Sequence, residues 1–485
     1  MKVRSPNLMP TFTCDLAQPS RPFFHFWEHT VGSGHAGLAL RADWQAQLRR
    51  CHEELGFQHV RFHALLSDRM GTLVCERNKN LYSFFNADQV MDFLVSIGMR
   101  PFVELSFMPE TLASGSVRVF SYQTNVTPPK SYRRWEELVH KLASHWTERY
   151  GANEVREWFF EVWNEPNLKA FWTGTQKGYF KLYEITAKAL KRVDPLLKVG
   201  GPATAKNAWI SDFLGFCESR KVPVDFVSTH HYPTDAFGKA GSNTISQLQH
   251  APPHVMRDDV RQVRRQAKGL PIYYTEWNIS SNPRDPLHDE PFAAAYAAKI
   301  ILEARGLVEG YSFWTFSDIF DENYFPSVPF QGGFGLLNLH GIAKPVYRAF
   351  ELLHRLGTEI FEVQGDHETV DAWCVAQPTA ATLLLSNHAM PRHRIRKEVV
   401  NVRIKSSRSP RRVYTERIDE QHANPRKVWE AMGRPEYLNT AQVEKLKAAS
   451  RLEKEAQRWT YKNGNLSCAV KIAPHGIAAV TFEFA

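Results

Sequence analysis

The chain has 485 residues, enough at roughly 150 residues per domain for two or three domains. Hydrophobic residues make up 43% and charged residues 23%, as in folded globular proteins, and the 27 glycines and 28 prolines exclude a collagen-like or low-complexity chain. The formal net charge is +9, and part of this surplus lies in two basic runs, at 392–397 and 403–412.

We interpret the basic runs as a solvated face or a charged strand edge, because no helix-turn-helix, zinc finger or RNP-like segment accompanies them. No segment reaches the roughly 18 uncharged apolar residues that a membrane span requires, and residues 1–6 lead into no apolar signal core. The six cysteines form no CxxC pair, which predicts ordinary thiols, no zinc site and no disulfide framework. We therefore expect a cytoplasmic protein with no nucleic-acid or membrane partner.

Short apolar runs alternate with helical stretches from about residue 22 to 355. The runs predicted to be strands are 23–27, 59–62, 101–105, 159–163, 198–200, 225–228, 272–275 and 311–314. The stretches with helical spacing are 44–55, 87–97, 135–146, 179–190, 208–217, 254–267, 291–304 and 345–356. This repetition predicts a (β/α)8 TIM barrel. A doubly wound open sheet is the alternative, but no GxGxxG motif follows the first run.

The pattern changes after about residue 357. Segments 370–375, 382–385, 398–404 and 477–484 have the composition of strands, and a helical stretch at 440–458 interrupts them. We therefore predict a catalytic barrel over 16–356 and a second, mostly β, sandwich-like accessory domain over 357–485. Residues 1–15 carry no helix signal and are expected to add a strand to that second domain.

Two predicted barrel strands end in carboxylates. The fourth ends in Asn164-Glu165-Pro166, and the seventh ends in Glu276-Trp277-Asn278. Barrel enzymes place catalytic side chains at the carboxyl ends of their strands, so Glu165 and Glu276 are expected to face one cavity. Glycoside hydrolysis requires such a pair, one carboxyl group to protonate the departing oxygen and one to stabilise or capture the sugar carbon.

A retaining mechanism needs the two carboxyl groups about 5 Å apart, and strands four and seven lie across the barrel from each other. The two environments must differ, so that one group holds its proton near neutrality and the other does not. Either glutamate alone could equally be a surface residue or part of a buried ion pair. Together, at two strand ends, they favour a glycosidase over a catalytically silent sugar-binding protein.

The chain resembles glycoside hydrolase family 39, the family of β-xylosidases and α-L-iduronidases, and is closer to the bacterial β-xylosidases. The likeness extends over both predicted domains. Its motifs lie at 32–41, 60–63, 100–104, 112–115, 160–169, 223–228, 314–318, 332–335 and 432–435.

The resemblance implies a role for each matching position. Glu165 corresponds to the general acid/base and Glu276 to the nucleophile. The expected substrate-binding residues are Asn164 on the sugar 2-hydroxyl, His63 on another hydroxyl, His230 as an orienting partner of Glu276, Trp314 as the floor of the sugar subsite, Glu322 on the outer hydroxyls, and Phe334 in a glycine-flanked loop.

Other notable residues in these strands can be explained by structural roles alone. Glu161 shares a strand face with Glu165 by the period-two count and is interpreted as a structural interior acid. Glu104, near the end of the third strand, could be either structural or part of the site. The aromatic residues at 159, 160 and 163 are expected to be core.

The activity implied is that of a retaining, exo-acting β-D-xylosidase that acts on short oligosaccharides and whose chemistry needs neither a metal nor an organic cofactor. Two departures bear on the substrate. Ser281 stands where the family's xylosidases usually carry tyrosine, and the segment 231–235 also differs from the family. Another sugar, such as an arabinoside, galactoside, glucoside or uronide, therefore remains an alternative, and the oligomeric state is left open.

Overall fold

The computed structural model describes residues 9–77, 79–236, 243–323 and 325–484. Its centre is a closed barrel of eight parallel strands, which the described part of the chain forms in the order β10-β11-β12-β13-β14-β3-β4-β7. Their bounds are β3 Thr30–His35, β4 His59–His63, β7 Arg100–Leu105, β10 Phe159–Val162, β11 Lys198–Ala205, β12 Phe226–His231, β13 Ile272–Trp277 and β14 Gly310–Phe313. The predicted barrel is confirmed.

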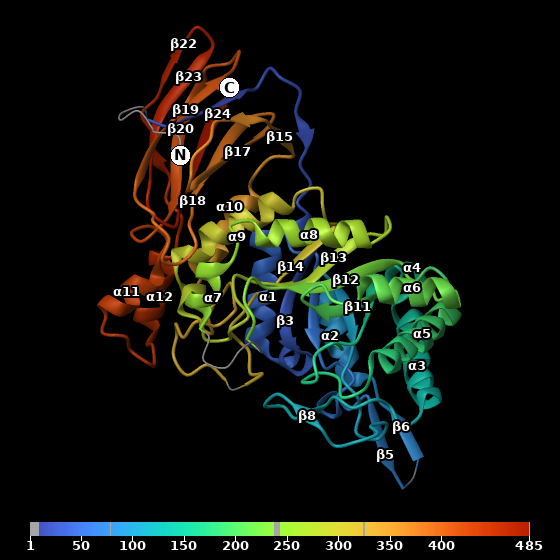
Figure 1. Ribbon diagram of the computed structural model, residues 1–485. Coiled ribbons are helices and arrows are strands. Elements are labelled where there is room, and N and C mark those ends of the chain that lie inside the picture. Colours follow the sequence, from blue (N-terminus) through green and yellow to red (C-terminus); the bar gives the residue numbers. More distant parts are fainter. Residues whose placement is uncertain (1–8, 78, 237–242, 324, 485) are drawn as a thin grey trace.

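Helices surround the barrel and connect its strands (Figure 1). They are α1 Ala42–Leu55, α2 Phe85–Ser96, α3 Tyr132–Tyr150, α4 Ala152–Val155, α5 Gln176–Val193, α6 Ile210–Arg220, α7 Thr244–His250, α8 Val255–Gln266, α9 Pro291–Ala304 and α10 Pro345–His354. Short 3-10 helices add η1 Phe26–Glu28, η2 Ala36–Leu40, η3 Asp68–Met70 and η4 Pro286–Asp289. Among the described residues, no helix combines the length and apolar character needed to cross a bilayer.

The first barrel strand differs from its prediction. The aromatic run at 23–27 leads into η1, and the strand is β3, which starts at Thr30. Gly32 stands in this strand where a buried strand would usually have a bulky side chain. A Cβ at this position would lie 2.6 Å from the ring of Trp314, so only glycine fits. An apolar-run criterion cannot detect a strand that is built around such close approach.

The barrel interior is filled in layers with the period of two residues that a strand imposes. Near the amino-terminal ends, Phe102, Phe159 and Phe226 form one aromatic cluster. Two residues further along their strands, Glu104 and Glu161 face each other as register partners of β7 and β10. A charged layer therefore lies directly above an aromatic one, and the site lies above both.

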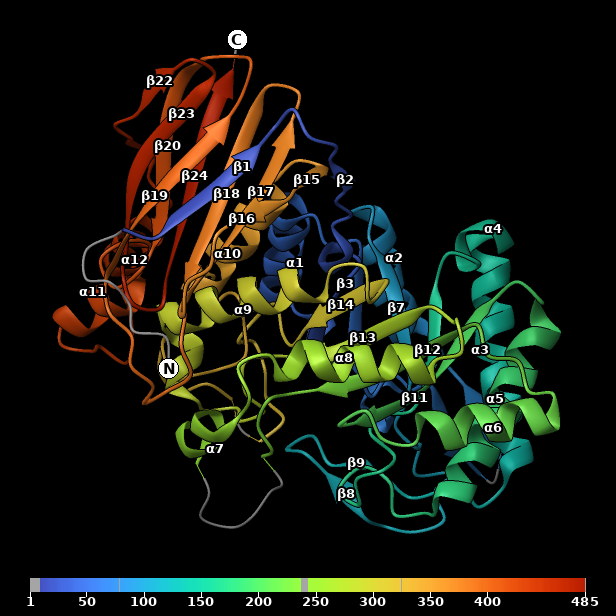
Figure 2. The same ribbon diagram turned by 45° about the horizontal axis from the view of Figure 1, so that its top comes forward.

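The second part of the chain forms two sheets (Figure 2). One has the order β16-β1-β19-β23-β22 and the other β2-β15-β17-β18-β24-β20-β21. The bounds are β1 Thr11–Asp15, β2 Arg21–Pro22, β15 Glu359–Phe361, β16 Val363–Gln364, β17 Val370–Gln377, β18 Ala380–Asn387, β19 Glu398–Lys405, β20 Pro410–Ile418, β21 Glu455–Ala456, β22 Thr460–Lys462, β23 Asn465–Ile472 and β24 Gly476–Phe484.

The expected N-terminal strand is present as β1, which runs parallel to β19 and lies beside it in Figure 2. Residues 1–8 and 485 of the predicted accessory domain lie outside the described residues. The sequence prediction missed β20 and β23. It also placed one helix at 440–458, where α12 Thr440–Ala449 ends earlier and the short strand β21 follows, and it missed the separate helix α11 Pro425–Ala431.

Helix α9 joins the two parts of the molecule. Most of its residues are buried, as expected of a helix that is apolar on all sides. It contacts the barrel helices α8 and α10 and also the strands β18 and β24. Lys299 of α9 binds Asp371 at 2.6 Å, and the Ser386 hydroxyl donates to the Ala295 carbonyl at 3.0 Å. The barrel therefore rests on the β-rich part through a packed interface.

Two small hairpins, β5 Leu73–Glu76 with β6 Lys79–Tyr82 and β8 Arg118–Val119 with β9 Thr124–Asn125, project from the barrel loops.

Candidate active site

A cavity of about 430 Å³ opens at the carboxyl ends of the barrel strands. This volume is suited to a small oligosaccharide or its terminal sugar. Of the eight residues predicted for the site, seven line the cavity, and His230 is buried beside the two glutamates. The seven are His63, Asn164, Glu165, Glu276, Trp314, Glu322 and Phe334.

The two predicted carboxylates lie close together. Glu165 follows β10, Glu276 belongs to β13, and both are buried. One carboxylate oxygen of each and a ring nitrogen of His230 all lie within 4.8 Å of one another. This separation matches the roughly 5 Å that direct attack by one carboxylate requires and is too short to admit an intervening water.

Arg61 is the buried cation of the site. Its guanidinium donates to Glu161 at 2.6 Å and to Glu276 at 2.8 Å, and it lies 2.7 Å from Glu104. It also donates to the Oδ1 of Asn164 at 3.0 Å. Arg61 and Glu161 are fully buried, so these contacts replace all of the water that the charges lose on folding.

The environment of Glu276 favours its ionised form relative to Glu165. Burial raises the pKa of Glu276, while the charges of Arg61 and His63 oppose that rise. The Tyr232 hydroxyl adds a hydrogen bond to Oε2 at 3.0 Å. Both carboxylate oxygens of Glu276 thus have donors that bind the charged form.

Among the described residues, no lysine or arginine forms an ion pair with Glu165. Burial and then the negative charge of Glu276 raise the pKa of Glu165 well above its ordinary value. Its Oε1 lies 3.0 Å from the Nδ1 of His230, and burial holds the pKa of that histidine well below its usual range. The pair of glutamates therefore has separated proton affinities, with the proton on Glu165.

The hydrogen bond of His230 differs from its prediction. The ring was expected to orient Glu276, but its Nδ1 is 3.5 Å from that carboxylate and bonds Glu165 instead. Arg61 lies 3.3 Å from Nε2, where only a lone pair can accept from a guanidinium. This contact fixes the tautomer with its proton on Nδ1, from which it donates to Glu165.

His63 forms a second charged group at the cavity. Its Nδ1 is 2.7 Å from Glu104, and its Nε2 is 3.4 Å from Glu322. These two carboxylates outweigh the effect of burial and raise the pKa of His63 to about 10. The imidazolium therefore presents a donor to the cavity near neutral pH.

The chain carries backbone strain next to Glu165. Trp163 and Glu165 both have positive φ angles, 70° and 42°, which residues other than glycine rarely adopt. The Glu165 amide donates to the Ala203 carbonyl at 2.8 Å, and the Trp163 indole donates to the Phe171 carbonyl at 2.8 Å. These bonds hold the turn that aims the carboxyl group into the cavity.

Aromatic rings form one wall of the cavity, where Trp314, Phe320 and Phe334 pack as one cluster. The loop that carries Phe334 is clamped from beneath by the fully buried Lys344, which donates to the Gly333 carbonyl at 2.8 Å. Lys344 pairs with Asp289 at 2.8 Å and with Asp318 at 2.6 Å. The loop requires its glycine at position 333, because a Cβ there would lie 2.3 Å from Asp318.

The two family departures contact each other. The Ser281 hydroxyl lies 3.1 Å from the Thr234 hydroxyl and accepts the amide hydrogen of Ala236 at 2.8 Å. The Ser281 amide donates in turn to Thr234. Both residues line the cavity, so the small side chain at 281 is matched to the altered segment after β12.

Several site residues escaped the sequence prediction. Arg61 lies in the family motif at 60–63 and is a charged residue within an apolar strand, but no role was predicted for it. Tyr232 follows β12 directly and was noted only as part of a departure from the family. Lys344 carried no signal, because its partners lie on separate loops.

The group Glu165–His230–Glu276 has the residue types of a metal site. Its ligand atoms are already engaged, however. Arg61 and Tyr232 bind the two oxygens of Glu276, and the Nδ1 of His230 carries a proton. The donor set therefore fits proton and glycosyl transfer better than it fits a bound cation.

Comparisons with known proteins agree with this geometry. The model of the family described as glycosyl hydrolases family 39 matches residues 12–467. A β-xylosidase of Caldicellulosiruptor saccharolyticus is 50% identical over 94% of this chain and 95% of its own length, and a β-xylosidase of Geobacillus stearothermophilus is 41% identical over 87% and 86%. The crystal structure of a monomeric β-xylosidase from Caulobacter crescentus CB15 has a TM-score of 0.87 at 32% identity and covers 98% of this chain and 99% of its own.

Replacement of Arg61 by Met should leave three buried carboxylates without their cation. We expect the free energy of unfolding at pH 7 to fall by about 3–5 kcal/mol, measured by urea denaturation. The matched control is Arg149→Met, which removes an exposed ion pair with Asp92 and should cost less than about 1 kcal/mol. Similar losses in the two variants would contradict the importance assigned to Arg61.

Proposed function

The chain belongs to glycosyl hydrolase family 39, and from this premise we propose that it is a retaining, exo-acting β-D-xylosidase that releases terminal xylose from short xylooligosaccharides. The observation that carries the proposal is the placement of Glu165 and Glu276, with carboxylate oxygens within 4.8 Å of each other in one cavity. The similarity to two β-xylosidases over most of the chain supports the choice of sugar.

In the first step, a carboxylate oxygen of Glu276 attacks the anomeric carbon as the bond from that carbon to the leaving oxygen breaks. Glu165 gives its proton to the leaving oxygen. His230 donates to Oε1 of Glu165, which leaves Oε2 to carry the transferred proton. Arg61 and Tyr232 hold the attacking carboxylate in its charged form and fix its orientation.

In the second step, water replaces the leaving group. Glu165, now ionised, takes a proton from the water as its oxygen bonds to the anomeric carbon. The bond between that carbon and Glu276 breaks, and the carboxylate returns to Arg61. Two displacements at one carbon release the sugar with its original configuration.

The remaining site residues bind the sugar in this proposal. Asn164, held by Arg61 through its Oδ1, is left to donate from its amide nitrogen to the 2-hydroxyl. His63 and Glu322 meet the outer hydroxyls and close the end of the cavity. Trp314 and Phe334 supply the apolar surface under the ring.

The proposal has two wider parts. Residues 16–356 act as the catalytic unit, and residues 357–485 together with 1–15 act as an accessory β-sandwich domain. The location is cytoplasmic, which is supported by six cysteines that are all free thiols, five of them buried.

The wild-type protein should hydrolyse an aryl β-D-xyloside faster than the matching arabinoside, galactoside, glucoside and glucuronide. Proton NMR during turnover should detect β-xylose first, before mutarotation. Initial release of the α-anomer would contradict retention, while a faster rate on another sugar would overturn the substrate assignment and leave the mechanism intact.

Glu276→Ala should abolish hydrolysis of the aryl β-xyloside, because no carboxylate remains to capture the sugar. Azide should restore part of the turnover and yield the α-xylosyl azide, detected by NMR. Undiminished hydrolysis without azide would remove Glu276 from its role.

Glu165→Ala provides the contrast within the same pair. It should retain more of the wild-type rate on an aryl xyloside with an acidic phenol than on xylobiose, because the former leaves without a proton. Equal losses on both substrates would count against Glu165 as the acid.

Tyr232→Phe should shift the pH dependence of kcat/KM. The acidic limb reflects protonation of Glu276, and loss of the hydrogen bond to its charged form raises its pKa, so this limb should move about one pH unit upward. The alkaline limb, set by Glu165, should move less. Tyr296→Phe, a buried tyrosine in α9, is the control and should leave both limbs in place.

A further inference from the structure

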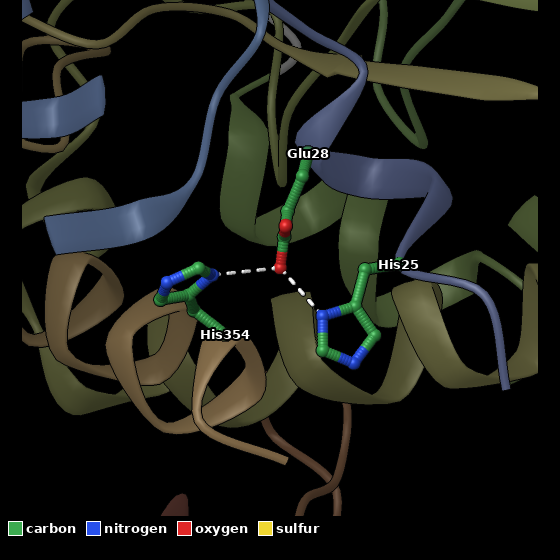
Figure 3. A group of neighbouring side chains, drawn as sticks. All are labelled: His25, Glu28 and His354. Atoms are coloured by element: carbon green, nitrogen blue, oxygen red, sulfur yellow. Dashed lines mark hydrogen bonds and ion pairs between the residues drawn. The ribbon is translucent and has the colours of Figure 1, made fainter. Parts of the chain in front are cut away.

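A second cluster of ionisable side chains lies at the opposite, amino-terminal end of the barrel (Figure 3). It consists of His25, just before η1, Glu28 at the end of η1, and His354 at the end of α10. In the described part of the chain, it is one of two groups in which three potential ligand atoms lie within 4.8 Å of one another. The proposed reaction uses none of the three residues.

The three side chains converge on one oxygen. Oε1 of Glu28 lies 2.6 Å from the Nδ1 of His25 and 2.9 Å from the Nδ1 of His354. Figure 3 shows the carboxylate between the two rings, with both Nδ1 atoms turned toward it. Burial alone would raise the pKa of Glu28, but the hydrogen bonds from His25 and His354 outweigh it and lower that pKa, so the carboxylate is ionised near neutral pH.

The outer nitrogen of His25 fixes its chemistry. Its Nε2 lies 3.3 Å from the carbonyl oxygen of Gly357, which can only accept. Nε2 therefore carries a proton. The 2.6 Å contact of Nδ1 with the carboxylate needs a proton as well, and loss of that proton would free the Nδ1 lone pair for an ion while Nε2 stays bonded to Gly357. An imidazole whose second nitrogen is held by a carbonyl is the usual arrangement of a metal-binding histidine.

We propose that His25, Glu28 and His354 bind a divalent transition-metal ion of the zinc type. Two imidazole nitrogens and one carboxylate oxygen are a ligand set that Zn²⁺ accepts, with a water in the fourth position. Ligand atoms about 2.0–2.1 Å from the ion lie roughly 3.3 Å apart in a tetrahedron. Oε1 of Glu28 must therefore move about half an ångström away from each ring nitrogen, a movement that small side-chain rotations supply.

Access and space both suit an ion at this point. The His354 side chain is 35% exposed, while those of His25 and Glu28 are 16% and 10% exposed, so one side of the group is open to water. Gly56 closes the other side. A Cβ at Gly56 would lie 2.6 Å from both Glu28 and His354, so the glycine leaves room for the carboxylate and the ring.

The site would act as a structural cross-link. Glu28 and His354 are 326 residues apart, and they join the segment before the first barrel strand to the last barrel helix. Gly357, which holds His25, lies where the chain leaves the barrel for the β-rich part. An ion that binds only the folded chain stabilises it by mass action, and this one would join the first and last segments of the barrel. The sequence expectation of no zinc site concerned cysteine pairs, and this ligand set contains none.

The test uses the full-length protein after dialysis against EDTA. Calorimetric titration with ZnCl2 should show one site of this class. Zinc at roughly a hundred times its Kd should raise Tm by about 3 °C. Cobalt(II) at the same site should give the visible absorption of a tetrahedral complex.

Variants locate the ion. His25→Gln and His354→Gln should each weaken zinc binding by more than about tenfold, the lower end of the loss caused by removal of a mere outer-shell partner. At the zinc concentration used for the wild type, each should cut the rise in Tm to about half or less. His145→Gln is the matched control, because His145 pairs with Asp88 at 2.8 Å and is 34% exposed but belongs to no such three-ligand group. Glu276→Gln should retain the binding, which distinguishes this site from the catalytic cavity.

Two outcomes would overturn the proposal. One is a wild-type protein without zinc-dependent heat or Tm change, which would mean that protons alone close the group. The other is unchanged binding in both histidine variants. The wild-type titration and the cobalt spectrum need no variant, so poor folding of a variant leaves the test decisive.

Discussion

The site depends on one buried guanidinium. Arg61 is fully buried and is surrounded by Glu104, Glu161 and Glu276. Glu104 and Glu161 lie in the buried layer beneath the cavity, and Glu276 faces the cavity. A positive charge fixed in this position keeps one member of the glutamate pair ionised, and the negative charge so created raises the proton affinity of the other. In the proposed mechanism, the difference between acid and nucleophile thus arises from charges in the barrel interior.

Buried layers and buried cations also support the walls of the cavity. The layers beneath it are set by the period-two alternation of the strands, which stacks the charged layer on the aromatic cluster of Phe102, Phe159 and Phe226. Beside the cavity, the buried Lys344 pairs with Asp289 and Asp318 and so holds the loop of the aromatic wall in place. Arg61 holds the buried carboxylates in the same way. Ser281 and Thr234, at the two departures from the family, contact each other in the cavity lining and make no contact with Arg61.

The sequence predicted the features that are local in the chain. Alternating strands and helices identified the barrel, and Glu165 and Glu276 were evident because each ends an apolar strand with a carboxylate. Features that depend on contacts between distant segments were missed. The partners of Arg61 lie up to 215 residues away in the sequence. His230 hydrogen-bonds Glu165 because Arg61 fixes the histidine tautomer. The first strand was not detected because the ring of Trp314 leaves room only for glycine at position 32, and glycine adds nothing to an apolar pattern.

The central claim is that the carboxylate bound by Arg61 is the one that forms the glycosyl bond. The most direct measurement is to trap that bond with an activated 2-deoxy-2-fluoro-β-xyloside, digest the protein and locate the label by mass spectrometry. This account predicts a single fluorosugar on the peptide that contains Glu276. A label on Glu165, or on a residue outside the cavity, would contradict it.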